Sequence, residues 1–288
     1  MLSVLAWSTT FAVLVLVALL LIDLQPVKKR APLNQAQQAL LDGERLHRLL
    51  HALQQHRGMS VACLAGDEGF VPGTRERRRL VELLLSELEQ QIGSQIVWCA
   101  SEELAQTRTQ WRELCLLLDA QPAALGVDET INRHSLLVAR VLGWKSALAR
   151  RCIAPVIGEE LQPLLRTWSD TLPALTEVLG QARAVGSAVA VRGVCSTPER
   201  MRLVALSTRA EALMQQAIMD VPRLPGALPA TERVVGLLGL LRGDAAMGTQ
   251  FAPGAEAYFD EATGAIDAVY AWMKVCEDTL RHAMSGTP

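Results

Sequence analysis

The sequence predicts an all-helical protein in which two antiparallel four-helix bundles follow an N-terminal transmembrane helix. The chain is 50% apolar but only 4% aromatic, with 2 Tyr and 4 Phe, whereas β-sheets favour aromatic and β-branched residues. Signals for the starts and ends of helices recur along all 288 residues. The first uncharged run is also long enough to cross a bilayer.

The predicted anchor is the run Leu2–Ile22, which contains no charged residue. A helix of this length crosses a bilayer core of roughly 30 Å. Neither a basic start nor a small-residue cleavage site accompanies the run, so we expect a single-pass anchor that is not removed. Lys28, Lys29 and Arg30 follow it, and the positive-inside rule then places the rest of the chain in the cytoplasm, at the inner membrane.

The cysteines agree with a cytoplasmic location, because none of them forms a C-x-x-C pair and they lie in helical stretches where small buried side chains are expected. They are Cys63, Cys99, Cys115, Cys152, Cys195 and Cys276. The alternative is a periplasmic domain with disulfides.

Four helices are predicted before Pro155, and each starts at a residue whose side chain caps the first turn. The capping residues are Asn34 (a capping box with Gln37), Thr74, Ser101 and Asp128. The first helix continues a Leu and Val stripe to about residue 64, and the others span about residues 75–92, 101–120 and 129–151.

About four helices follow Pro155 and Gly158. They span about residues 159–191, with a bend at Pro173, then 197–219, 231–241 and 255–282. The second of these has the strongest start, a capping box of Ser196 and Glu199. The predicted divisions are the anchor (1–24), a juxtamembrane segment (25–42), the first bundle (43–155) and the second bundle (156–288).

Two long helices carry related segments, 53–62 (LQQHRGMSVA) and 179–188 (LGQARAVGSA), which suggest an internal duplication. Arg57 and Arg183 match each other in these segments, 126 residues apart. Each arginine shares a helix face with an apolar stripe, and Arg242 does the same with Val235 and Leu238.

An arginine on a core-facing stripe needs a partner, because an unpaired buried ion costs several kcal/mol. Two alternatives stay open at this point. The partner is either an internal carboxylate, from Glu44, Glu177 or Asp244, or an anion that enters from outside the protein.

At these residues the sequence resembles the nitrate- and nitrite-sensing (NIT) domain family over about residues 40–285. The segment Gln54–Gly58 resembles the family's first motif, and Arg183–Ser187 resembles the second. The segment Ala255–Val269 (AEAYFDEATGAIDAV) resembles the family's late helix. The resemblance implies two four-helix bundles that bind a small planar anion, nitrate or nitrite, between helices.

The residues that the resemblance assigns to ligand binding are Arg57, Arg183, Arg242, His56 and Gly58. A guanidinium suits this ligand because it presents parallel N–H donors in one plane. His56 stands where many members carry another charged residue, so its protonation predicts tighter binding at lower pH. The chain contains no output domain, so we expect the signal to reach a separate protein, with a homodimer as a further candidate assembly.

Several function classes are not expected. The net charge of −2 does not favour nucleic-acid binding, and we find no phosphate loop, nucleophile elbow or dinucleotide fingerprint, so we expect neither an enzyme nor a cofactor. His47 and His51 lack the glutamate of a zinc motif, and we expect no metal site there. The alternative to a sensor is a membrane-tethered helical scaffold whose arginines are paired internally.

Overall fold

The computed structural model describes the backbone of residues 2–92, 98–247 and 254–285, and the side chains of residues 32–91, 98–122, 124–243 and 254–285. Every regular element in these residues is helical, which confirms the all-helical prediction. The α-helices are α1 (Leu2–Ala65), α2 (Val71–Ile92), α3 (Ser101–Ala120), α4 (Pro122–Leu148), α5 (Gln162–Arg166), α6 (Leu172–Arg192), α7 (Thr197–Asp220), α8 (Ala227–Met247) and α9 (Ala255–Ser285). Two π-helical segments, Ala149–Ile153 and Thr167–Thr171, lie between α4 and α6.

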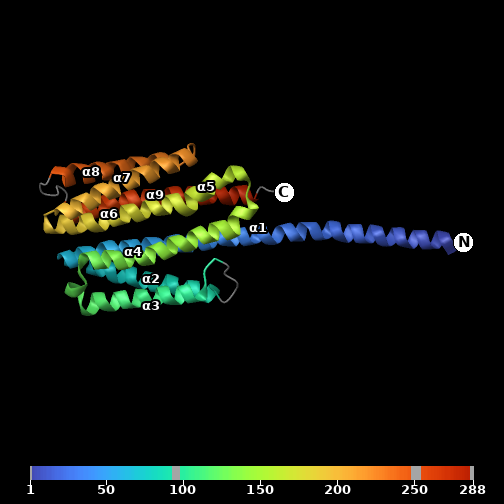
Figure 1. The fold of residues 1–288 in the computed structure, drawn as a ribbon, viewed down its shortest axis with the longest axis horizontal. Helices are drawn as coiled ribbons and strands as arrows, with labels where there is room; N and C mark the ends of the chain where they lie inside the picture. The colour runs from blue at the N-terminus through green and yellow to red at the C-terminus, as the bar shows by residue number, and fades with distance from the viewer. Residues whose placement is uncertain (1, 93–97, 248–253, 286–288) are drawn as a thin grey trace.

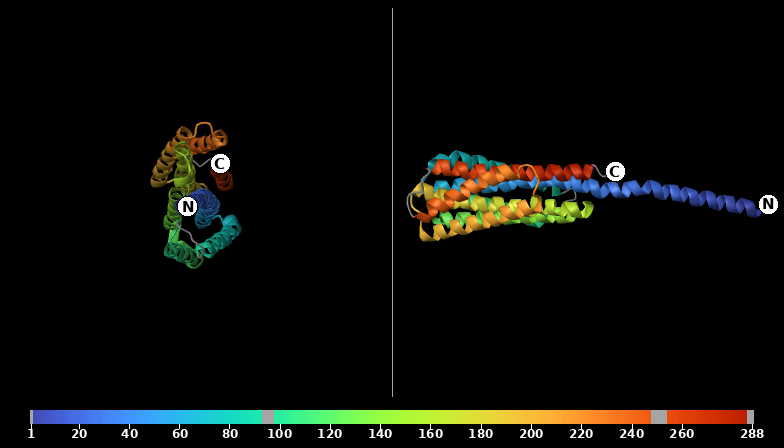
Figure 2. Two further views of the ribbon diagram at one scale, coloured as in Figure 1. Left: turned by 90° about the vertical axis from the view of Figure 1, so that its right-hand side faces the viewer. Right: turned by 90° about the horizontal axis from the view of Figure 1, so that it is seen from above.

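The long helices lie in two groups side by side (Figure 1). In the first group α1 contacts α2 and α4, and α3 contacts the same two helices; in the second group α6 contacts α7 and α9, and α8 contacts the same two. Figure 2 shows both groups end-on. Helices α1 and α6 pack against each other between the groups. The predicted stripes therefore meet there, with Leu46, Leu53, Leu172 and Leu179 all buried.

Helix α1 continues without a break from Leu2 to Ala65, and this corrects the predicted start at Asn34. A capping residue needs non-helical backbone before it. Because the residues ahead of Asn34 are already helical, its side chain has no free helix end to cap.

Thr74, predicted as an N-cap, lies inside a helix instead, and so does Thr231, the first residue of a predicted later helix. The hydroxyl of Thr74 donates to the carbonyl of Phe70, and that of Thr231 donates to the carbonyl of Ala227. This bond to the carbonyl four residues earlier is the common alternative to capping for a threonine within a helix. Helix α2 starts earlier than predicted, after a turn in which the Asp67 side chain accepts from the backbone N–H of Gly69.

The α4 and α6 regions also differ from the prediction. Helix α4 begins at Pro122, and Gly126 interrupts it with a φ of 68°, a left-handed value that suits glycine. Pro173 is the second residue of α6 and directly follows the π-helical segment Thr167–Thr171, so the helix is irregular where the bend was predicted. The capping box of Ser196 and Glu199 is confirmed at the start of α7.

All six cysteines are free. Five tryptophans are buried, as expected of core residues: Trp98, Trp111, Trp144, Trp168 and Trp272. Among the residues whose side chains are described, no helix is both long and apolar enough to cross a membrane. The predicted anchor, Leu2–Ile22, lies outside those residues.

Candidate functional site

Two arginines lie at the contact between α1 and α6, and each faces a glycine of the opposite helix. A Cβ atom built on Gly180 would lie 2.8 Å from Nη2 of Arg57, and one built on Gly58 would lie 3.1 Å from Nε of Arg183. Both guanidinium groups are fully buried. The expectation that Arg57 and Arg183 point inward is therefore confirmed. Gly180 and Gly58 have no side chains, and this leaves space for the two guanidinium groups.

Arg57 has an internal carboxylate partner. Its Nη1 lies 2.7 Å from Oε1 of Glu177, and its Nη2 lies 3.0 Å from Oε2. Its Nη1 also donates to the Ser135 hydroxyl at 2.9 Å. Of the two alternatives left open by the sequence, Arg57 follows the first, in which the protein itself supplies the negative charge.

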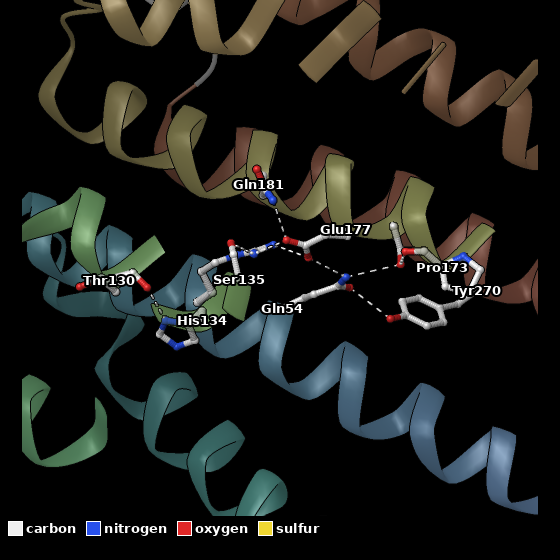
Figure 3. Close-up of polar contacts among 10 residues, drawn as sticks. Gln54, Thr130, His134, Ser135, Pro173, Glu177, Gln181 and Tyr270 are labelled. Atoms are coloured by element: carbon white, nitrogen blue, oxygen red, sulfur yellow. Dashed lines mark hydrogen bonds and ion pairs between the residues drawn. The ribbon is translucent and has the colours of Figure 1, made fainter. Parts of the chain in front are cut away.

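The carboxylate of Glu177 is held in place by further donors. The amide of Gln54 donates to Oε2 at 3.2 Å, and that of Gln181 donates to Oε1 at 2.8 Å. Gln54 in turn accepts from the hydroxyl of Tyr270 at 3.1 Å. Figure 3 shows Glu177 between the two glutamines, with Tyr270 beyond Gln54. This network joins α1, α4, α6 and α9, and it leaves Glu177 fully hydrogen-bonded.

Arg183 lacks such a partner. Its Nη1 donates to the hydroxyl of Thr263 at 2.8 Å, and the centre of its guanidinium lies 4.9 Å from the Phe259 ring. No residue in the described part of the chain accepts a hydrogen bond from Nε or Nη2 of this side chain. These two nitrogens form one edge of the guanidinium, whose two N–H bonds are parallel and suit a planar oxoanion.

The surroundings of Arg183 destabilise its positive charge. Burial, and then the positive charge of Arg57, lowers the pKa of Arg183 to about 10, although Asp267 acts in the opposite sense. The guanidinium is still protonated at neutral pH. A bound anion would offset both causes of the shift.

Arg242 is not part of this site, and its predicted inward orientation is wrong. Its side chain is 46% exposed and forms an ion pair with Glu211 on α7. The buried face of α8 is formed by Ala230, Val234, Leu237, Leu238 and Leu241. Val235, which was taken to mark the inward face, is 52% exposed. Helix α8 is apolar on most sides, so more than one of its faces has apolar residues at helical spacing. The face with Val234 and Leu241 is buried, and the face with Val235 and Arg242 is exposed.

His56 is buried, but it faces the first helix group and not the arginines. Its Nδ1 lies 2.8 Å from Nε2 of His134, and its ring packs edge-on against Trp111. Nδ1 of His134 lies 2.7 Å from the carbonyl of Thr130, which can only accept. His134 therefore donates through Nδ1 and, when neutral, accepts from His56 through Nε2.

The expected role of His56 as a switchable charge near neutral pH is wrong. Burial, and then the charge of Arg78, lowers the pKa of His56 to about 3. Burial is also the main cause that lowers the pKa of His134 well below 6.5. The imidazole of His56 is thus neutral in the pH range where a nitrate response was expected to change.

The two histidines predict a loss of stability in acid. Because both pKa values are lowered in the folded protein, the unfolded chain binds more protons below about pH 6.5, and protons favour unfolding. The free energy of unfolding should fall by up to about 1.4 kcal/mol per pH unit for each histidine. Urea unfolding at pH 7.5, 6.5 and 5.5 measures this slope. A double variant, His56→Leu with His134→Leu, should show a shallower slope, and an equal slope would contradict the assignment.

Sequence reasoning missed a third buried cation, Lys145 on α4. Its ammonium contacts the carbonyl of Trp168 and lies 3.6 Å from the centre of the Trp168 ring. Burial lowers the pKa of Lys145 well below 10.5. A backbone carbonyl and an aromatic face already surround this group, so it offers less to an anion than Arg183 does.

No metal site was expected at His47 and His51, because the glutamate of a zinc motif is missing. In the structure both histidines make other contacts. His47 is buried edge-on against Trp168, and His51 stacks on the ring of Tyr270. The described residues contain no group of three or more His, Cys, Asp or Glu side chains arranged to hold a metal ion.

Together the two helix groups and the guanidinium buried where they meet define an all-helical protein with a buried cation at the contact between its two halves. The chain belongs to the nitrate and nitrite sensing (NIT) family, whose model matches residues 48–285. The resemblance inferred from the motifs is thus confirmed. The family is defined by signal sensing.

The fold is similar to that of a solved structure described as the NasR transcription antiterminator. The TM-score is 0.68 and the sequence identity is 17%, over 89% of this chain and 71% of that one. At this identity the likeness concerns the fold. Among the curated proteins, none matches the sequence.

Proposed function

We propose that the protein is a membrane-anchored sensor that binds nitrate or nitrite at the free edge of Arg183. The observation that carries the proposal is the pair of parallel, unpartnered N–H donors at Nε and Nη2 of a fully buried guanidinium. The family supplies the ligand class, because its members sense nitrate and nitrite. Gly58 contributes by having no side chain where a methyl group would crowd Nε.

The charges around the site favour a monovalent anion. Arg57 and Arg183 contribute two positive charges, and Glu177 neutralises one of them. One nitrate or nitrite completes the balance, whereas sulfate would leave an excess negative charge in a buried place. Two charge-assisted hydrogen bonds are sufficient for millimolar to micromolar binding, which requires roughly 4–8 kcal/mol.

The remaining parts of the proposal concern signalling. Anion binding at Arg183 would tighten the contact between α1 and α6 and so repack the helices, which a separate signalling protein or a second copy of the chain detects. We place the anchor at Leu2–Ile22, in the cytoplasmic membrane, with the helix groups in the cytoplasm. The arrangement of the groups as two antiparallel four-helix bundles is part of the same proposal.

Nitrate should raise the melting temperature of the protein. At about 100 times the dissociation constant, one bound anion stabilises by about 2.7 kcal/mol, or roughly 5–10 °C in a domain of this size. Differential scanning fluorimetry with nitrate, nitrite, chloride and sulfate at equal ionic strength measures the effect. Arg183→Ala should abolish the nitrate response, whereas Arg242→Ala, a matched control at an exposed arginine, should retain it.

The scaffold alternative has its own support, because Arg57 and Arg242 each face a carboxylate. A scaffold predicts no difference between the four anions. An equal shift with chloride and nitrate, or a nitrate response that survives Arg183→Ala, would favour the scaffold over the sensor.

A further inference from the structure

The two buried arginines make the same contact with corresponding helices. Nη1 of Arg57 on α1 donates to the Ser135 hydroxyl on α4, and Nη1 of Arg183 on α6 donates to the Thr263 hydroxyl on α9. The distances are 2.9 Å and 2.8 Å. The arginines are 126 residues apart and the hydroxyl residues 128. The duplication suggested by the sequence therefore extends to the side-chain geometry.

Other features relate the pair α1 and α4 to the pair α6 and α9. Trp144 and Trp272, also 128 residues apart, are both buried on α4 and α9. Leu53 and Leu179, 126 residues apart, are both buried on α1 and α6. Each pair of helices is also in close contact. The protein thus contains two copies of one arginine site.

The copies differ in the residue that supplies negative charge from the opposite helix. Arg57 receives the carboxylate of Glu177, six residues before Arg183 on α6. The corresponding position on α1, six residues before Arg57, is His51. His51 gives Arg183 no carboxylate; its Nε2 lies 3.1 Å from Oδ1 of Asp267, and its ring stacks on Tyr270.

We propose that Glu177 is a built-in anion that occupies one of two duplicated anion sites, and that the histidine at position 51 keeps the other site open. Glu177 resembles a bound planar oxoanion in its contacts, because it meets the arginine in a bidentate pair and receives amide hydrogen bonds from Gln54 and Gln181. The part of this inference that concerns Arg183 rests on the proposed function.

Isothermal titration with nitrate, which reports the number of sites per chain, tests the inference on the full-length protein. The wild type should bind one nitrate. Glu177→Ala, which removes both the charge and the side chain that fills the site, should bind two. His51→Glu should bind none, because the new carboxylate reaches Arg183 as Glu177 reaches Arg57. Glu211→Ala, the matched control, removes the carboxylate beside the exposed Arg242 and should leave the number at one.

The outcomes separate this inference from the proposed function. A wild type that binds one nitrate and a Glu177→Ala variant that also binds one would overturn the inference and leave the function intact. A wild type that binds none and a Glu177→Ala variant that binds one would refute the proposed function and retain the built-in anion. Circular dichroism shows whether Glu177→Ala is folded; if it is not, His51→Glu decides, since continued binding of one nitrate there would overturn the inference.

Discussion

Arg57→Ala is expected to lower the free energy of unfolding by roughly 3–5 kcal/mol, the usual cost of removing one partner of a buried ion pair. The change would leave the Glu177 carboxylate, whose side chain is only 11% exposed, without its cation. It would also remove a hydrogen bond from Ser135. Urea unfolding at pH 7.5 measures the loss.

A double variant distinguishes the charge effect from a packing effect. Arg57→Met with Glu177→Leu replaces both partners by apolar side chains of similar size, and such replacements are often neutral or stabilising. We expect it to regain most of the lost stability. We also expect it to keep the nitrate response, because Arg183 retains its free edge. A double variant as unstable as Arg57→Ala would show that packing dominates, and one without a nitrate response would make Arg57 a ligand contact.

Gly186→Ala is expected to have the largest effect among glycine substitutions at the α6–α9 contact. The new Cβ would lie 2.2 Å from the phenol carbon and oxygen of Tyr258, far inside van der Waals contact. Tyr258 is fully buried and its hydroxyl donates to the carbonyl of Ala182 at 2.8 Å, so it cannot move aside without losing this bond. Overpacking typically costs 1–3 kcal/mol and the lost hydrogen bond about 1 kcal/mol more.

Gly239→Ala provides the matched control, because nothing lies within 4 Å of a Cβ at that helical glycine. There the substitution should be neutral or stabilising by up to about 1 kcal/mol, since alanine favours the helix. Thermal unfolding of both variants measures the contrast. Equal melting temperatures would mean that α6 and α9 pack less closely than described.

The inward arginines could be predicted because helical spacing specifies a face. Arg57 lies four residues from both Leu53 and Val61, and all three are buried. The same reasoning failed for Arg242 because α8 has apolar residues on several faces, and spacing alone does not say which face a neighbour covers. The face that α8 buries in the structure carries residues 230, 234, 237, 238 and 241.

The partners of the arginines depend on contacts between helices that no local pattern encodes. Glu177 was one of three carboxylates considered for Arg57, and only the packing of α1 on α6 selects it. Thr263 lies within the segment that resembles the family's late helix, yet nothing in that segment connects it with Arg183. Thr263 lies 128 residues after Ser135, close to the 126 residues between the two arginines. This spacing points to Thr263 as the partner of Arg183 only once the contact between Arg57 and Ser135 is known.

The buried histidine pair could not be predicted for the same reason. His56 and His134 are 78 residues apart and meet only because α1 and α4 pack together. Whether a histidine is charged depends on its burial, and a sequence motif that places a histidine beside an arginine does not specify this. His56 and Arg57 are consecutive in α1, but His56 contacts α4 of the first helix group and Arg57 pairs with Glu177 on α6 of the second.

The unbroken course of α1 has a mechanical consequence. The helix contains no proline between Leu33 and Ala65. From Arg57 to Leu33 the axis covers about 36 Å at 1.5 Å per residue. Because backbone hydrogen bonds join every turn between these two residues, an axial displacement of the helix at Arg57 would also displace Leu33.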